Sequence, residues 1–367
     1  MITALRIKHF KAHKDSVLSL SNLTLLCGQN GVGKSSVLQS LLLLRQTHQK
    51  KILSNGLDLN NPLCYIGKAK DALYQYAEDE HITFVLQNES GEFSWIFDSK
   101  ISGSTFLDLS SDIDNMAGFE DIALFSNDFQ YVSAARLVSK MGSSDDYAVK
   151  YLKQISLEKG QCELTLHFLH ENQSNDINLA LKHTDTEHLD LLTQTAKWES
   201  EISKGVNIHL YEIGNSYEVK FSFDMQNGDR TDEFSSDNVG FGLSYVLPVI
   251  VAILSAPKGS LLLIENPEAH LHPYGQAKLA ELMCLAAEAG IQIIVETHSD
   301  HIINGCLVAC KKEQIKVENI KIIYFDRDEI QHAAKAIEVP ILKGGKIKKP
   351  PKGFFDQIGK DLRTLMS

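Results

Sequence analysis

A nine-residue stretch near the N-terminus, GQNGVGKSS (28–36), constrains the fold more than any other part of this 367-residue chain. It follows the apolar run LTLLC and precedes a segment in which Val37, Leu38, Leu41 and Leu42 recur at helical spacing. Strand, glycine-rich loop and helix in this order form a GxxxxGK[ST] loop, whose backbone N–H groups surround phosphate oxygens. The sequence therefore predicts a phosphate-binding loop (P-loop) in an α/β fold.

Each residue type in this loop has a chemical role. The glycines let the backbone turn its N–H groups toward phosphate, the lysine can reach the β- and γ-phosphates, and the following serine can ligate Mg²⁺. ATP and Mg²⁺ are the expected ligands. The residues predicted to contact them here are Asn30, Gly31, Val32, Gly33, Lys34, Ser35 and Ser36.

A second stretch, LLLIENPEAHLHP (261–273), runs from four aliphatic residues directly into polar groups. Three interpretations compete: a magnesium site, a histidine-rich metal site, or a strand end followed by a capped helix. A P-loop enzyme needs an acid at the end of a neighbouring buried strand to hold Mg²⁺. Glu265 is such an acid, and a buried charge there is costly unless a cation or hydrogen bonds meet it. We therefore predict that Ser35 and Glu265 hold the metal.

The histidine-rich alternative rests on four side chains, at positions 270, 272, 298 and 301. An HxH pair with two further histidines could bind Zn²⁺. However, no cysteine or further carboxylate completes a recognisable spacing, so the magnesium-site interpretation is favoured.

Bulk properties exclude several classes of protein. A formal net charge of −11 argues against a protein that coats nucleic acid, although a local basic patch stays open. The longest apolar run, 245–254, is far shorter than the roughly 20 residues of a membrane helix. The N-terminus has no signal-peptide pattern, and the six scattered cysteines suggest reduced, buried thiols. We expect a cytoplasmic protein without membrane segments.

Strand and helix patterns divide the chain into three parts. Aliphatic strands alternating with helices predict a parallel sheet covered on both faces, built from residues 1–142 and 206–340. Short β-type runs over 81–132 (HITFVLQ, EFSWIFDSKI, FQYVSA) suggest a β-meander appended to this core, and a hairpin is expected around Gly214 and Asn215. Residues 143–205 are polar and partly helical, as in an insertion. Residues 341–367 read as a basic linker and an amphipathic helix.

Three of these segments together resemble a known family. GQNGVGKSS, ENPEAHLHP and ETHSDH look like the ATP-binding-cassette (ABC) ATPases of the structural-maintenance-of-chromosomes (SMC), RecF and overcoming-lysogenization-defect (OLD) type. More closely, they resemble stand-alone bacterial relatives associated with antiphage defence. The resemblance covers about 1–50 and 236–330, plus a terminal GFFDQIGKDL segment. It implies a P-loop NTPase fold of the ABC/SMC head, with a mixed sheet. Only about 65 residues follow ETHSDH, so we expect no Toprim nuclease domain of the OLD kind.

The resemblance implies roles for particular residues. His298 matches the switch histidine that senses the γ-phosphate. Lys11 and His13 match a basic loop that reaches the nucleotide, and solvated loop residues are the alternative interpretation. Gly240, Gly242 and Ser244 occupy the place of the signature motif, which in the family contacts the γ-phosphate bound to the other subunit. A head-to-tail homodimer around ATP is thereby implied. The sequence of this segment, GFGLS, differs from the usual signature sequence LSGGQ. The alternative interpretation of GFGLS is a close-packed turn.

The departure from the family pattern is at position 266. The typical cassette has a glutamate there that polarises the attacking water, whereas this chain has Asn266, which cannot accept a proton. Either Glu268 takes over, or hydrolysis is slow and the protein acts as an ATP-gated switch. A structural alternative is that Glu268 only caps or salt-bridges the helix that follows.

Two features have no role that the sequence defines. Arg136 in YVSAARLVSK resembles a recurrent arginine of the closer relatives, and a surface salt bridge is its default interpretation. Residues 341–352 hold five lysines and no acid, followed by apolar residues at helical spacing. That segment suits either docking on its own core or contact with a partner or nucleic acid.

These observations lead to one main hypothesis and two alternatives. The main hypothesis is a slow ATPase that dimerises around ATP·Mg²⁺ and regulates a partner effector, such as a nuclease, in antiphage defence. A non-hydrolysing ATP-gated scaffold or clamp, and a RecF-like DNA-repair ATPase, are the alternatives. The sequence does not identify the effector, its trigger or any nucleic acid bound.

Overall fold

The computed structural model describes residues 1–110, 118–136, 141–355 and 357–366. Within them, a central sheet has six strands in the order β16 (Ala334–Val339), β15 (Ile320–Arg327), β3 (Leu23–Gly28), β14 (Gln292–Glu296), β13 (Leu261–Glu265) and β8 (Phe129–Val132). All neighbours are parallel except β16, which is antiparallel to β15. The inner strands are continuous aliphatic runs because both faces of the sheet are covered. The predicted α/β class with a mixed sheet is confirmed.

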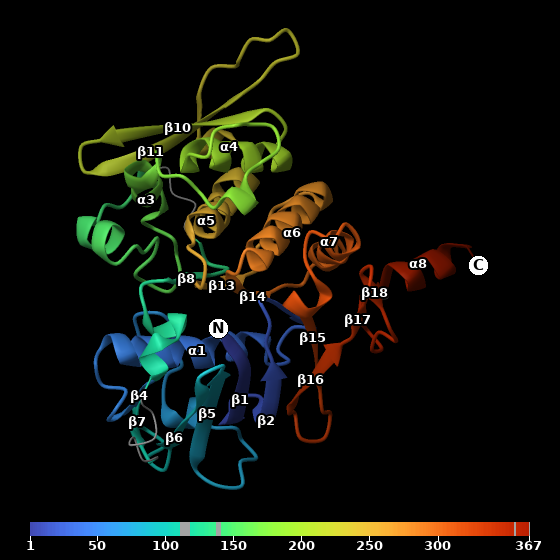
Figure 1. Ribbon diagram of the computed structural model, residues 1–367. Coiled ribbons are helices and arrows are strands. Elements are labelled where there is room, and N and C mark those ends of the chain that lie inside the picture. The colour runs from blue at the N-terminus through green and yellow to red at the C-terminus, as the bar shows by residue number, and fades with distance from the viewer. Residues whose placement is uncertain (111–117, 137–140, 356, 367) are drawn as a thin grey trace.

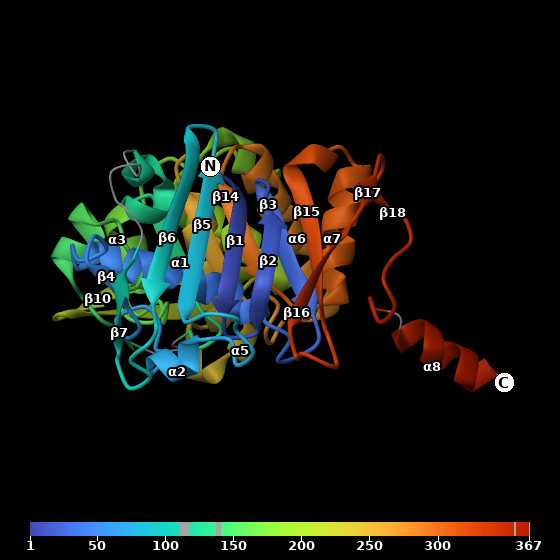
Figure 2. The same ribbon diagram turned by 90° about the horizontal axis from the view of Figure 1, so that it is seen from below.

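Each face of the central sheet packs against a different layer (Figures 1 and 2). On one face lies α1 (Lys34–Gln49), which shares a hydrophobic core with Leu263 and Ile294 of the sheet. On the other face lie α5 (Phe241–Ser255), α6 (Pro273–Glu288) and α7 (Asp300–Lys311). Since alternate residues of a strand point to opposite faces, Glu265 and Glu296 are on the α1 face, like Leu263 and Ile294. Both acids therefore end their strands on the side of the P-loop.

A second sheet covers the outer side of α1. It is antiparallel, in the order β2 (His13–Ser19), β1 (Ile2–Phe10), β5 (His81–Asn88), β6 (Gly91–Asp98), β7 (Phe106–Leu109) and β4 (Gly56–Asp58), with α2 (Ala69–Ala72) nearby. The predicted meander corresponds to β5, β6 and β7. The assignment of FQYVSA to that meander is wrong, because β8 pairs in parallel with β13 at the edge of the central sheet.

A further layer lies beyond α5 and α6. The predicted hairpin is present as β10 (Val206–Ile213) and β11 (Ser216–Phe223), which is joined by the short strands β9 (Met141–Gly142) and β12 (Phe234–Ser235). The stretch 143–205 contributes α3 (Thr165–Asn172) and α4 (Leu191–Ile202). Buried side chains such as Leu169 and Trp198 place these helices in one hydrophobic core with α5 and α6.

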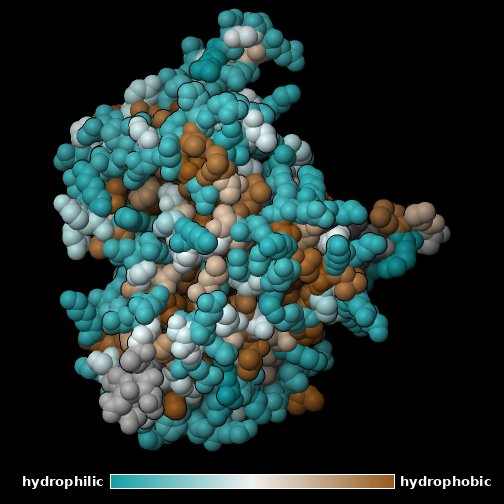
Figure 3. All heavy atoms as spheres, in the orientation of Figure 1, coloured by the Kyte–Doolittle hydropathy of each residue, from teal (hydrophilic) through white to brown (hydrophobic). Residues whose placement is uncertain are grey.

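The C-terminal segment leaves the body of the molecule. A small hairpin of β17 (Ile341–Leu342) and β18 (Lys346–Ile347) precedes Phe354, which is buried edge-on to Tyr324. Helix α8 (Gln357–Met366) then projects outward, and Figure 3 shows apolar atoms at its tip. Leu365 and Met366 are more than 80% exposed on this helix.

All six cysteines are buried and free, as expected from their scattered positions. Among the residues described, no helix is both long and apolar enough to cross a membrane.

Candidate active site

The P-loop joins the end of β3 to the start of α1, where the backbone needs glycine. Gly28 has φ +135°, and a Cβ there would be 2.3 Å from the Phe325 carbonyl oxygen on β15. Gly33 has φ +105° and is the N-cap of α1. Because side-chain-bearing residues rarely adopt these conformations, the glycines fix the path of the loop. The helix N-terminus, which attracts anions, is left at the carboxyl edge of the sheet.

Two side chains at the start of α1 face this edge. Lys34 Nζ donates to the Gly28 and Gln29 carbonyls at 3.0 and 2.6 Å, and burial lowers its pKa. Ser35 Oγ donates to Glu296 Oε1 at 2.9 Å. Of the other predicted loop residues, Asn30 and Gly31 are exposed, whereas Val32 and Ser36 are buried. Lys34 and Ser35 therefore lie at the carboxyl edge of the sheet, at the N-terminus of α1.

Two side chains from neighbouring strands, His13 and Arg327, form hydrogen bonds with the backbone of the loop. The side chain of His13 is fully buried. Its Nε2 contacts the Gly33 carbonyl at 3.0 Å, and its Nδ1 contacts the Ser16 hydroxyl at 2.9 Å. Arg327, at the end of β15, donates to the Gly31 carbonyl at 2.8 Å. Lys11, which is predicted to reach the nucleotide, lies in the β1–β2 turn and donates to Gln39 Oε1 on α1, one turn after Ser35.

Glu265 and Glu296 end adjacent strands in register, so their Cα atoms are roughly 4.8 Å apart. The Glu265 carboxylate accepts from the Tyr131 hydroxyl at 2.9 Å and from the Ala134 N–H at 3.1 Å. Burial, followed by the Glu265 charge, raises the pKa of Tyr131, so this phenol stays protonated and donates. Glu265 thus holds the end of β8, whereas Glu296 holds the P-loop serine.

The residues after Glu265 form a turn against the end of β14. Asn266 has φ +43°, a left-handed conformation that asparagine tolerates better than glutamate, and its N–H donates to the Glu296 carbonyl at 2.8 Å. Glu268 Oε1 accepts from the His298 N–H at 2.8 Å. Burial raises the pKa of Glu268, and this hydrogen bond opposes the shift. Glu268 does not cap the next helix, because α6 begins at Pro273 with His272 as its N-cap.

His298 is brought to the same place as the P-loop. Burial lowers the pKa of its imidazole, the nearby Lys34 charge lowers it further, and a hydrogen bond with the Gly28 backbone opposes both. The sequence predictions for Lys34, Glu265, Glu268 and His298 therefore converge on one edge of the sheet.

Arg136 is not a surface residue, and the salt-bridge interpretation is wrong. It is 4% exposed and donates to the carbonyls of Ser133, Tyr245, Glu265 and Asn266 at 2.7–3.0 Å. Its guanidinium also lies 4.2 Å from the Tyr245 ring centroid. One buried cation thus ties α5 to the end of β13, through carbonyls that the sequence does not reveal.

The segment with signature-like spelling begins α5. Gly240 is the N-cap, and a Cβ on Gly242 would lie 2.7 Å from the His270 carbonyl oxygen. The Ser244 hydroxyl is buried and has no hydrogen-bond partner among the described residues. Across that same part of the chain, no hydrogen bond joins Gly240–Ser244 to the P-loop. Gly242 is therefore closely packed in the first turn of α5, and the Ser244 hydroxyl is left unpaired.

Sequence reasoning missed Glu296. The run IIVE repeats the pattern of LLIE: aliphatic residues ending in an acid. That repetition is the sequence signal that could have predicted a second acid at the carboxyl edge. The histidine-rich alternative finds no support, since the described residues contain no group of three or more His, Cys, Asp and Glu side chains placed to hold a metal.

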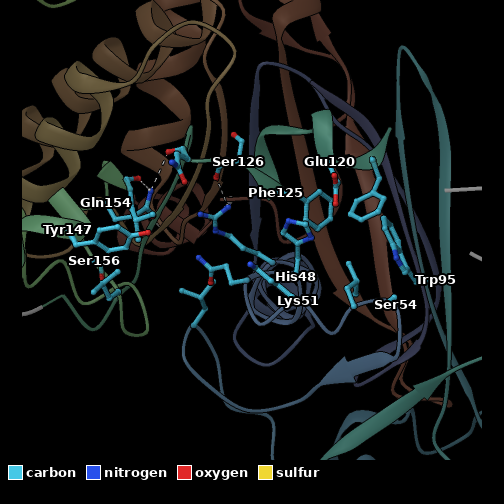
Figure 4. Close-up of a pocket in the computed structure, with 18 residues that line it drawn as sticks. His48, Lys51, Ser54, Trp95, Glu120, Phe125, Ser126, Tyr147, Gln154 and Ser156 are labelled. Atoms are coloured by element: carbon cyan, nitrogen blue, oxygen red, sulfur yellow. Dashed lines mark hydrogen bonds between the residues drawn. The ribbon is translucent and has the colours of Figure 1, made fainter. Parts of the chain in front are cut away.

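A cavity of about 770 Å³ lies at the other end of α1, about 24 Å along the helix from the P-loop. Figure 4 shows His48, Phe125 and Trp95 on one side of it and Tyr147 and Gln154 on the other. None of the sequence-predicted site residues lines this cavity. The sequence-predicted residues Lys34, Ser35, Glu265, Glu268 and His298 lie instead at the carboxyl edge of the sheet.

The fold is that of P-loop NTPases of the SMC-head type, and two parts of the chain match ATPase-domain models. Three family models match separate parts of the chain. One described as "AAA ATPase domain" matches residues 1–94, one described as "AAA domain, putative AbiEii toxin, Type IV TA system" matches 166–304, and one described as "Protein of unknown function (DUF3696)" matches 315–365. The second match includes α4, α5, the Glu265 strand and His298.

Solved structures of SMC heads share the fold. An SMC head bound to the C-terminal winged-helix domain of ScpA is 14% identical, covers 92% of this chain and 98% of its own, and has a TM-score of 0.54. An SMC head with an extended coiled coil, bound to the C-terminal domain of ScpA derived from Pyrococcus furiosus, is 13% identical, covers 100% and 99%, and has a TM-score of 0.50. At these identities the likeness concerns the fold. No curated protein sequence matches.

Proposed function

We propose that the chain binds ATP with Mg²⁺ at the P-loop, hydrolyses it slowly, and uses the nucleotide to control how two copies associate. The observation that carries this proposal is the convergence at one sheet edge of Lys34, Ser35, the acids Glu265 and Glu268, and His298. Matches to two ATPase-domain models support it.

The chain's own residues suit a divalent cation. Ser35 offers a hydroxyl, and Glu265 ends the neighbouring strand on the same face. Glu296, bonded to Ser35, keeps a buried oxygen with no partner among the described residues. In this proposal Ser35 and Glu265 hold Mg²⁺. When bound, the ion offsets charge on the β- and γ-phosphate oxygens.

The remaining roles follow from position. The backbone of Asn30–Ser36 surrounds the phosphates, Lys34 neutralises them and Lys11 contributes from the β1–β2 turn. His298, held next to Lys34 and Gly28, stabilises the γ-phosphate. Glu268 activates water because its raised pKa makes it a better base, and Asn266 orients that water through its amide.

We also propose a head-to-tail homodimer in which Gly240, Gly242 and Ser244 of one copy contact the γ-phosphate bound to the other. The unpaired Ser244 hydroxyl at the start of α5 supports this role. The two SMC heads are bound to part of ScpA. By analogy, this dimer would regulate a cytoplasmic effector, such as a nuclease, in antiphage defence. The lysines of 341–352 could contact that partner or nucleic acid.

A specific observation favours a second candidate, the non-hydrolysing scaffold. Asn266 stands where the family has its glutamate, and the Glu268 carboxylate already accepts the His298 N–H. If that bond persists in the ATP complex, Glu268 is less free to take a proton.

Phosphate release by wild type and Glu268→Gln separates the two candidates. With Glu268 as base, we expect a loss of roughly 10²- to 10⁴-fold in turnover, while the affinity for a fluorescent ATP analogue is kept. Glu92→Gln, an exposed acid on β6, is the control and should turn over normally. Unchanged turnover in Glu268→Gln would contradict its role. No phosphate release from the wild type, with ATP-dependent association intact, would favour the scaffold.

A further inference from the structure

The carboxylate that Ser35 contacts is not the one that the sequence predicted for the metal. Ser35 Oγ donates to Glu296 Oε1 at 2.9 Å, whereas both hydrogen bonds to the Glu265 carboxylate come from the β8 end, from Tyr131 and Ala134. The order of the strands explains this. Because β14 lies between β3 and β13, the acid on β14 is the one directly beside the P-loop strand.

Glu296 is an unusual residue to bury. It is 6% exposed, and its Oε2 is buried without a hydrogen-bond partner in the part of the chain described. Such an atom loses its hydration with nothing in return. Buried carboxylates are typically paired with cations or metals, and here the nearby cation is Lys34.

A second acid makes the arrangement costlier. Glu265 and Glu296 are in register on adjacent strands and lie on the same face of the sheet. Two carboxylates this close repel each other, and a divalent cation between or beside them relieves the repulsion. A hard cation would therefore coordinate the Ser35 hydroxyl and the unpaired Glu296 oxygen, and would also offset the charges of the two neighbouring acids.

We propose that Glu296 is a metal-side carboxylate of this site: together with Ser35 it binds the divalent cation that accompanies ATP, directly or through a coordinated water. Glu265 then acts from the next strand while holding the end of β8. This inference rests on the proposed function, since it concerns the cation that ATP brings. It makes Glu296 more than a support for the serine side chain.

The test measures metal binding and not turnover. The full chain is loaded with AMP-PNP, a non-hydrolysable ATP analogue, and titrated with Mn²⁺ while free Mn²⁺ is followed by electron paramagnetic resonance. For Glu296→Gln we expect a roughly 10- to 100-fold loss in Mn²⁺ affinity. In EDTA, AMP-PNP binding should be unchanged or tighter, because one negative charge near the phosphates is gone.

Glu199→Gln is the matched control. Glu199 is a 0% exposed acid on α4, on the other side of the central sheet, and neither carboxylate oxygen has a partner among the described residues. Replacing its carboxyl group with an amide should leave Mn²⁺ affinity within about twofold of wild type. A loss shared by both variants would mean that burying an amide disturbs the fold, and would overturn the assignment.

A second comparison separates a ligand from a positioning residue. If Glu296 only orients Ser35, it has no role in a Ser35→Ala background, and Glu296→Gln would cause no further loss of Mn²⁺ affinity there. A metal-side carboxylate still weakens Mn²⁺ binding there. Unchanged Mn²⁺ affinity in Glu296→Gln, in either background, would overturn the proposal. Failure of the wild type to bind AMP-PNP would instead contradict the proposed function.

Discussion

At the scale of single residues, the shape of the P-loop depends on a histidine that burial keeps neutral. The Gly33 carbonyl can only accept a hydrogen, so His13 Nε2 carries the proton and Nδ1 accepts from the Ser16 hydroxyl. Burial lowers the pKa of His13 to about 4, and the charge of Lys11 acts in the same direction. The imidazole is therefore a fixed, uncharged link between β2 and the N-cap of α1.

This link predicts a pH dependence of stability. The ordinary pKa of 6.5 applies in the unfolded chain and about 4 in the folded one, so the unfolded state binds more protons between these values. Stability is complete above pH 6.5 and falls as the pH drops toward 4. His13 alone should remove about 2 kcal/mol of unfolding free energy between pH 7.5 and pH 5. Urea unfolding at the two pH values measures this difference.

The control for this prediction is His13→Gln, whose amide can still donate to Gly33 but does not titrate. The variant should lose less stability than wild type over the same pH interval. Equal slopes in the two proteins would show that His13 titrates normally in the folded state.

At the scale of elements, one buried arginine couples the helix of the signature-like segment to the strand of the acidic edge. Arg136 contacts the Tyr245 carbonyl and ring on α5 and the carbonyls of Glu265 and Asn266 after β13, and the Tyr245 hydroxyl donates to the Ala134 carbonyl. If α5 moves on nucleotide binding, Arg136 would therefore shift the turn that contains Asn266 and Glu268.

Arg136→Met should be strongly destabilising, since it keeps side-chain length but leaves four buried carbonyls without their donor. We expect a loss of at least about 3 kcal/mol in unfolding free energy, measured by urea denaturation. Arg136→Lys should recover only part of it, because an ammonium cannot reproduce the planar fork. Arg363→Met, at an exposed position on α8, is the control. A loss below about 1 kcal/mol in Arg136→Met would contradict the proposed role of Arg136 in joining α5 to the end of β13.

The elements also show which parts of the site could be predicted from sequence. The inner strands and the helices of the core follow from aliphatic runs and helical spacing, and GxxxxGK[ST] places Lys34 and Ser35 without a structure. The order of the strands does not follow from these local patterns. Only that order sets Glu296 beside the P-loop, and only non-local pairing moves the four-residue β8 from the meander to the central sheet. The burial of Arg136 does not follow from the sequence, because its hydrogen-bond partners are backbone carbonyls, which every residue has.

At the scale of the whole molecule, the P-loop and the signature-like segment do not contact each other among the described residues of one copy. The P-loop and Gly240–Ser244 share no hydrogen bond in the described chain, and Gly242 is fixed against the His270 carbonyl. Next to it, Phe241 is 66% exposed at the start of α5. A large apolar side chain beside an unpaired serine is suited to a contact that forms only when nucleotide brings two chains together.

The last prediction concerns that contact. With ATP and Mg²⁺, the slow Glu268→Gln variant should have about twice the monomer mass of 40.9 kDa by size-exclusion chromatography with light scattering, and should be monomeric with ADP. Adding Phe241→Glu should abolish this dimer without changing affinity for a fluorescent ATP analogue, because it sets a charge against the partner chain. The matched control is Leu179→Glu, at a side chain 68% exposed on a short turn (Leu179–Leu181) remote in sequence from both motifs, which should still dimerise. If Phe241→Glu dimerises as well as Leu179→Glu, the start of α5 is not the dimer face, and the head-to-tail arrangement must be abandoned even if ATP binding stands.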